Sequence, residues 1–308
     1  MATKIIASGT VFTNFIGADR LLGMYPGAAA AYSLRQVGSG IYAGPLVTIR
    51  RSSDNLTMDF YAVNNAVSID DVKLFVGSGD GTVVTLYDQT GNGLHATQPT
   101  AGFQPKVISG GTPVLLNGKP SIMFDGVDDF LSIPQALPQQ FKAANAELSM
   151  FFVAETKTTA SFTVLSMAAR DSTVANDNDL LLFQCNGQYS GVNGGVGMFL
   201  RIVRTSTAIK SVVSPTALKT AGRSGGLIRS GLTAFAVDGS AVGTPGDMNA
   251  IGMHLEQATI GATRRGINPV TEASNPNSKI AEIIMYPSDK GAVNQGVIGN
   301  MADYYSTI

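Results

Sequence analysis

Short apolar or alternating runs recur along most of the chain, and each run ends in Gly, Asn, Asp or Pro. Two runs show the pattern clearly: residues 83–88 (VVTLYD) lead into QTGNG, and residues 120–125 (PSIMFD) lead into GVDD. Runs rich in β-branched and aromatic residues favour strands, and glycine tolerates the positive φ of tight turns. The pattern therefore predicts an antiparallel all-β domain.

The same pattern places the individual elements. The run LSMFFVA at 148–154 is almost continuously apolar, which is typical of a strand at the centre of a sheet. A hairpin is predicted through Asp238-Gly239. Helices are predicted over 28–35, over 68–76 with Ser68 as N-cap, and over 288–305. Further strands are predicted at 46–51, 58–63, 120–124, 130–133, 162–167, 179–185, 197–204, 227–237, 257–262 and 279–286.

Residues 1–26 lack the regular spacing of the later runs but carry several apolar side chains. One interpretation is a strand folded onto the domain, and the other is an arm that docks onto another subunit. We divide the chain into an attachment or oligomerisation arm, 1–26, and one sandwich domain, 27–308. Apolar β-like runs suit strand addition to a neighbour's sheet edge, so a homo-oligomer is expected, with a trimer as the specific prediction.

Composition narrows the function. Hydrophobic residues make up 44% of the 308 positions, whereas charged residues make up 14%. The 21 basic and 22 acidic residues nearly cancel, so nothing indicates nucleic-acid binding. The one cysteine, Cys185, excludes an internal disulfide. No signal-peptide pattern and no run of about 18 apolar residues is present, which predicts synthesis in the cytoplasm without Sec export or membrane insertion.

A family resemblance rests on five segments: AAYSLRQV, VTIRRSSDN, VTLYDQTGNGLHATQ, QPKVI and GKPSIMFDGVDDFL. Together they resemble the concanavalin A-like, LamG-type lectin/glucanase modules of bacteriophage structural proteins, over roughly residues 29–133. Residues 31–98 are also similar to the start of the catalytic sandwich of α-L-arabinofuranosidase B. The resemblance implies a concanavalin A-like jelly-roll sandwich of two antiparallel sheets with short flanking helices.

Glycoside hydrolysis requires two carboxyl groups about 5 to 10 Å apart. The Glu-x-Asp-x-x-Glu strand typical of sandwich glucanases is absent from this sequence. Glu155 and Glu282 lie in predicted strands, where unpaired glutamates are expected to face solvent. The sequence therefore predicts that the chain is not an enzyme and has no catalytic residue.

Two loops carry the candidate binding sites. Residues 171–179 form the densest oxygen-rich segment, and carboxylates are the usual Ca²⁺ ligands. No cofactor is predicted, with Ca²⁺ as the alternative at Asp171, Asp177 and Asp179. Predicted glycan contacts are Asn176, Asn178, Gln188, Tyr189 and Asn193. The carboxylates of Asp125, Asp128 and Asp129 are expected to bond turn amides instead.

These observations favour a virion structural protein of a bacteriophage, either a fibre, a spike or a capsid-decoration subunit. Its partners would be other virion proteins, held through residues 1–26, and a host-surface glycan bound by the lectin-like sandwich. The alternative is a glycoside hydrolase of the arabinofuranosidase-like kind, and a third interpretation is a free cytosolic lectin. Tyr87 and Phe124 are predicted to be buried parts of the scaffold.

Overall fold

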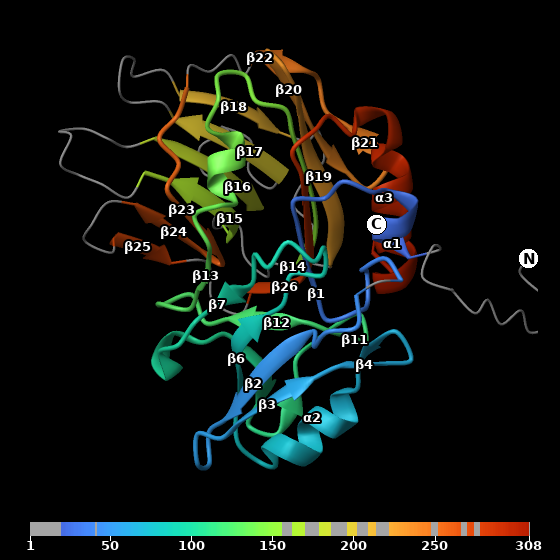
Figure 1. Ribbon diagram of the computed structural model, residues 1–308, viewed down its shortest axis with the longest axis vertical. Helices are drawn as coiled ribbons and strands as arrows, with labels where there is room; N and C mark the ends of the chain where they lie inside the picture. The colour runs from blue at the N-terminus through green and yellow to red at the C-terminus, as the bar shows by residue number, and fades with distance from the viewer. Residues whose placement is uncertain are drawn as a thin grey trace, which may run out of the picture.

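A computed structural model describes residues 20–40, 42–155, 162–169, 179–185, 196–201, 209–213, 222–247, 252–265, 270–273 and 278–307. Its strands form two antiparallel layers that face each other, and short helices lie on their outer sides (Figure 1). The all-β sandwich predicted from the hydrophobic pattern is confirmed. Within the described ranges, no helix is long and apolar enough to cross a membrane.

The first layer, called the front layer here, contains ten strands of the described chain, from β3 at one edge to β18 at the other. Neighbouring strands pair antiparallel throughout. In spatial order they are β3 (Thr57–Phe60), β2 (Val47–Arg51), β6 (Gly81–Leu86), β7 (Ala96–Thr97), β13 (Leu131–Ile133), β23 (Gln257–Ile260), β15 (Phe162–Ala168), β16 (Leu180–Cys185), β17 (Val196–Arg201) and β18 (Ile209–Val213).

The back layer is built around two long neighbouring strands, β26 (Ser278–Tyr286) and β14 (Leu148–Glu155). On one side of this pair lie β1 (Ala30–Ser33) and β12 (Ile122–Phe124), and on the other lie β19 (Arg223–Ser230) and β20 (Thr233–Asp238). Strand β8 (Lys106–Ser109) pairs with both β6 and β12 and so joins the two layers.

Small hairpins complete the sheet system. Strand β20 turns through Gly239 into β21 (Ala241–Val242), which confirms the predicted Asp238-Gly239 hairpin. The remaining short strands are β4 (Ala62–Val63), β5 (Ala66–Val67), β9 (Thr112–Pro113), β10 (Leu115–Leu116), β11 (Lys119–Pro120), β22 (Gly246–Asp247), β24 (Ala262–Arg265) and β25 (Val270–Ala273).

Strand β14 shows how the layers bury apolar surface. Met150 and Phe152 point into the main core between the layers. Phe151 and Val153 point to the other face of the back layer, into a second core beneath the C-terminal helix. All eight residues of β14 are buried, so the prediction of a central strand is confirmed.

Three α-helices accompany the sandwich in the described part of the chain. Helix α2 (Ile69–Val76) begins at Ser68, whose hydroxyl accepts the Asp71 amide at 3.3 Å, as the predicted N-cap requires. Helix α3 (Asn294–Tyr305) covers the second core, with Val297, Ile298 and Met301 buried (Figure 1). Helix α1 (Leu21–Met24) is a single short turn beside it.

Several predicted elements differ from the structure in type or extent. Helix α3 begins at Asn294 rather than at residue 288, and the strands predicted at 58–63 and 257–262 are each divided into two. The alanine-rich segment 28–35 forms strand β1 rather than a helix, because it lies buried against β26, and burial overrides the helix preference of alanine. The predicted strand 227–237 is two strands, β19 and β20, separated by a turn at Gly231 and Leu232. Gly231 has a positive φ of 57°, which glycine adopts readily.

The described end of the predicted arm contacts its own chain. Leu21 and Leu22 are buried in the second core. The Leu22 amide donates to Val37 O at 3.0 Å, and the Tyr286 hydroxyl donates to Tyr25 O at 2.8 Å. Residues 1–19 lie outside the described ranges. The arm boundary at residue 26 and the trimer stay predictions.

Candidate functional site

A row of hydroxyl side chains crosses the outer face of the front layer. The strand register pairs Thr48 with Thr85, Thr85 with Thr97, and Thr97 with Ser132. It continues from Ser132 to Thr259 and from Thr259 to Ser166. Directly paired residues point to the same face of a sheet. We call Thr48, Thr85, Thr97, Ser132, Thr259 and Ser166 the hydroxyl row.

The residues next to the hydroxyl row in sequence show which face of the front layer the row lies on. Ile49, Leu86, Ala96 and Leu131 each follow or precede a member of the hydroxyl row, and all are buried in the main core. Successive strand residues point to opposite faces, so the hydroxyl row faces away from that core. Five strand spacings of about 4.8 Å give the row a length of roughly 24 Å.

The two ends of the row differ in exposure. Ser166 and Thr259 are buried, and their hydroxyl oxygens lie 2.9 Å apart. Thr259 donates to Ala262 O at 2.7 Å, so strand β24 satisfies this end. At the other end Thr48 donates to the exposed carboxylate of Asp59 at 2.5 Å. The half of the row on β2, β6 and β7 is therefore the more open to a ligand.

Aromatic side chains flank the open half. Tyr87 lies two residues beyond Thr85, and its ring meets that of His95 edge to face, with centroids 4.9 Å apart. The Tyr87 hydroxyl lies 3.1 Å from the Thr48 hydroxyl. Tyr87 is half-buried rather than largely buried, so that prediction is wrong, because its ring lies on the outer face. Rings beside hydroxyls suit sugar binding, since a sugar presents both apolar and hydroxyl surface.

Phe124 and Asp88 belong to the scaffold. Phe124 is fully buried, as predicted. The Asp88 carboxylate is also fully buried, and it accepts the amides of Ala31, Thr90 and Leu94 at 3.0 to 3.2 Å. The run VVTLYD thus ends in a carboxylate that ties together β1 and the loop after β6.

The turn before β13 gathers three carboxylates. One oxygen from each of Asp125, Asp128 and Asp129 lies within 4.8 Å of the others. Asp125 Oδ1 accepts the Val127 amide at 2.8 Å, and Asp129 Oδ2 accepts the Asp125 amide at 2.8 Å. The predicted role in bonding turn amides is confirmed for the carboxylates of Asp125 and Asp129. Burial, together with the nearby charges of Asp125 and Asp128, raises the pKa of Asp129 to about 6.

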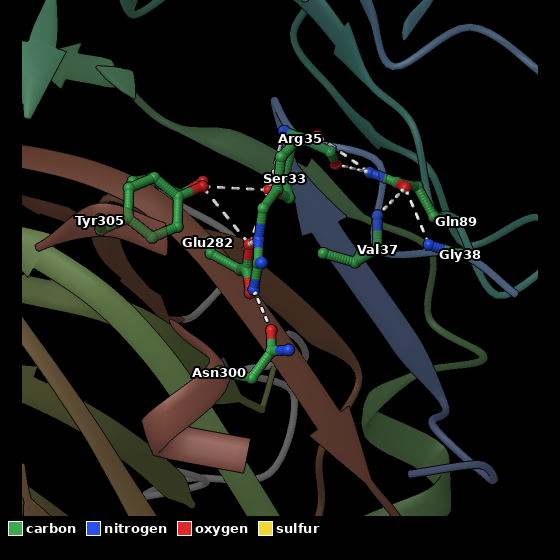
Figure 2. Close-up of polar contacts among 9 residues, drawn as sticks. Ser33, Arg35, Val37, Gly38, Gln89, Glu282, Asn300 and Tyr305 are labelled. Carbon is green, nitrogen blue, oxygen red and sulfur yellow. Dashed lines mark hydrogen bonds and ion pairs between the residues drawn. The ribbon is translucent and has the colours of Figure 1, made fainter. Parts of the chain in front are cut away.

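Glu282 and Glu155 do not face solvent, which corrects the sequence-based expectation. Glu282 is 1% exposed and accepts Arg35 Nε at 2.7 Å and Arg35 Nη2 at 2.8 Å (Figure 2). It also accepts the Ser33 hydroxyl at 2.8 Å. Glu155 pairs with Lys279 Nζ at 3.0 Å. Both carboxylates are on the back layer and are held in ion pairs.

A second polar group secures the segment after β1. Gln89 Oε1 accepts the amides of Val37 and Gly38 at 2.9 and 3.1 Å (Figure 2). Gln89 Nε2 donates to Ser33 O and Arg35 O at 3.0 and 2.9 Å. Because every polar atom of the buried Gln89 amide is bonded to backbone, it fixes the position from which Arg35 reaches Glu282.

Most of the predicted loop site lies outside the described residues. The site residues that fall outside are Asp171, Asn176, Asp177, Asn178, Gln188, Tyr189 and Asn193. Asp179 is described: it is fully buried, and its Oδ2 accepts the His254 amide at 2.7 Å. The Ca²⁺ and glycan assignments at these positions stay predictions. The hydroxyl row was not predicted from the sequence, although several of its Thr and Ser residues lie inside predicted strands and indicated a polar strand face.

Comparisons with known proteins point to one group of enzymes. No family profile matches the chain. A probable α-L-arabinofuranosidase B of Aspergillus clavatus is 30% identical over 133 residues, which is 37% of this chain and 26% of that protein. The α-L-arabinofuranosidase of Hypocrea jecorina is 29% identical over 130 residues, or 38% and 26% of the two chains. The matched segment thus spans about a quarter of these relatives.

Solved structures share the fold over most of the chain. A GH54 α-L-arabinofuranosidase soaked with a cyclic sulfate inhibitor superposes with a TM-score of 0.62 at 15% identity. An arabinofuranosidase complexed with arabinofuranosyl-α-1,2-xylobiose gives a TM-score of 0.61, also at 15% identity. Each similarity covers 89% of this chain and 62% of the other.

These findings correct one prediction and leave another without support. The prediction that the chain is not an enzyme is contradicted, because the relatives described above, and the two solved structures that superpose on most of the chain, are α-L-arabinofuranosidases. The resemblance to arabinofuranosidase B is confirmed, whereas a bacteriophage role gains no support. The location in a virion and the subunit partners stay predictions.

Proposed function

We propose that this chain is a glycoside hydrolase of the α-L-arabinofuranosidase kind. The observation that carries the proposal is the agreement of two independent similarities. A segment of 133 residues is related in sequence to arabinofuranosidase B, and the fold of such enzymes extends over 89% of the chain. The substrate class is a glycoside with a terminal arabinofuranosyl group.

The outer face of the front layer supplies a surface for the substrate. The hydroxyl row offers donors and acceptors for sugar hydroxyls, and Tyr87 with His95 offers an aromatic edge beside it. A hydrogen bond from the backbone to His95 determines which imidazole nitrogen remains able to bind a ligand. The Asp88 amide donates to His95 Nδ1 at 3.1 Å, so Nε2 carries the proton and can donate to a sugar oxygen.

The reaction itself breaks the glycosidic C–O bond. Water adds its hydroxyl to the anomeric carbon, and its proton ends on the leaving-group oxygen. This chemistry requires one carboxylic acid as proton donor and a second carboxylate as base or nucleophile. Glu155 and Glu282 are excluded from both roles in our proposal, because each is buried in an ion pair on the back layer.

Covalent labelling tests the proposal and locates the carboxylate. The full chain would be incubated with an arabinofuranose-configured covalent inactivator, digested, and mapped by mass spectrometry. We expect one adduct on an Asp or Glu side chain, with none on Glu155 or Glu282. A matched inactivator of glucose configuration is the control. An unlabelled folded protein, or equal labelling by both reagents, would contradict the proposal.

A further inference from the structure

A pocket of about 190 Å³ lies beside α1 and α3, away from the hydroxyl row. Two arginines, Arg20 and Arg35, reach it from the start of α1 and the end of β1. Asn64 and Asn65 line it from the turn between β4 and β5, and Asn300 and Tyr304 line it from α3. The pocket thus collects amides and guanidinium groups from segments far apart in sequence.

Arg20 is the group that most requires a ligand. Its Nε is buried and has no hydrogen-bond partner within the described part of the chain. A buried donor without a partner costs free energy comparable to a lost hydrogen bond, and more when the group is charged. A small movement of this side chain would let an oxygen ligand in the pocket supply the acceptor that the described residues do not.

Arg35 and Asn300 present further donors. The Glu282 carboxylate takes Arg35 Nε and Nη2, and Asn300 Oδ1 accepts from Nη2 at 2.9 Å (Figure 2). Arg35 Nη1 and Asn300 Nδ2 make no hydrogen bond to other described residues, so both are available to a ligand. The ion pair fixes the direction of these donors.

The local charge favours an anion. Glu282 offsets Arg35, but the described chain shows no ion pair for Arg20. Lys119 adds a second cation, with its Nζ 4.6 Å from the centre of the Tyr304 ring. A guanidinium binds a carboxylate through two parallel hydrogen bonds. The amides of Asn64, Asn65 and Asn300 suit hydroxyl groups, which both donate and accept.

We propose that this pocket binds a uronic acid residue of a glycan, with the carboxylate at Arg20 and the sugar hydroxyls at the asparagines. The volume is below the range of about 300 to 1,000 Å³ usual for drug-sized ligands, so it suits a single sugar ring. The site is separate from the proposed hydrolytic face. An acidic side group of a polysaccharide could then hold the chain on its substrate.

Calorimetric titration of the full chain tests this site without any reading of hydrolysis. The probes are sodium D-glucuronate and D-galacturonate at about 0.15 M salt, where long-range charge effects are screened. We expect at least one uronate to bind, with D-glucose, D-galactose and acetate each at least about tenfold weaker. The proposal would be overturned if neither uronate gave measurable binding. It would also be overturned if a neutral sugar or acetate bound as tightly as the uronate.

Three variants separate the site from general charge. Arg20→Gln should weaken uronate binding by about tenfold or more, whereas Lys142→Gln, which removes an exposed lysine outside the pocket, should not. Asn65 has a φ of 70°, so Asn65→Gly removes the amide without straining the turn. It should also weaken binding, and circular dichroism would confirm that it folds. Unchanged affinity in both pocket variants would refute the site.

Discussion

Replacing Glu282 with Gln should destabilise the protein severely, because it removes the charge that compensates a buried arginine. The Arg35 side chain is 11% exposed, and that of Glu282 is fully buried. Burial alone would lower the pKa of Arg35, but the Glu282 carboxylate raises it above its ordinary value. Arg35 therefore stays charged in the variant, without a carboxylate partner.

Removing one partner of a buried ion pair costs about 3 to 5 kcal/mol. Two hydrogen bonds beyond the ion pair place the expected cost in the upper half of that range. Glu282 also accepts the hydroxyls of Ser33 and Tyr305, at 2.8 and 3.3 Å. A domain is stable by about 5 to 15 kcal/mol, so the loss is a large part of the total.

Urea unfolding followed by circular dichroism measures this change as a shift in midpoint. Asp54→Asn is the matched control, because Asp54 makes the same two-bond contact with Arg51, at 2.8 and 2.7 Å, on the surface. Its midpoint should barely move, since exposed ion pairs are weak. The double variant Arg35→Met/Glu282→Gln should recover a large part of the loss.

A loss below about 1 kcal/mol for Glu282→Gln, which is the range of an exposed pair, would contradict the role given to this ion pair. A double variant no more stable than Glu282→Gln alone would contradict it as well.

Three further predictions follow from single side chains. Phe124→Ala should cost about 3 to 5 kcal/mol in urea unfolding, since its ring is fully buried in the main core; a loss below about 1 kcal/mol would contradict this. The folded-state pKa of Asp129 is about 6, above the ordinary 3.8, so its contribution to stability is complete below about pH 4 and is lost as the pH rises to 6. Asp129→Asn should remove this slope from stability measured between pH 4 and 7, and an unchanged slope would exclude Asp129 as its source. Tyr87→Ala should weaken binding to arabinoxylan in affinity electrophoresis by about fivefold or more, while Leu74→Ala, 85% exposed on α2, should not.

Local pattern was sufficient for elements whose partners are near in sequence. The Ser68 cap and the Asp238-Gly239 hairpin depend on contacts within a few residues, and both form as predicted. The apolar run 148–154 also indicated its own place, because a strand buried on both faces has few polar positions.

Contacts between residues far apart in the sequence could not be predicted from the local hydrophobic pattern. Arg35 and Glu282 are 247 positions apart, so nothing near Glu282 in sequence indicated that its carboxylate would be buried and paired. The prediction of a helix where β1 forms was wrong for the same reason, since the partner strand β26 lies near the other end of the chain. The hydroxyl row depends on the register of six strands, and register is fixed by the folded sheet.

Hydrolysis of 4-nitrophenyl α-L-arabinofuranoside is the measurement that tests the proposed function most directly. We predict release of 4-nitrophenol in proportion to protein concentration, with the β-D-glucopyranoside of the same phenol released far more slowly. A covalent inactivator of arabinofuranose configuration should abolish the release. A well-folded protein that releases no nitrophenol from the arabinofuranoside at high concentration would contradict the assignment as an arabinofuranosidase-like hydrolase.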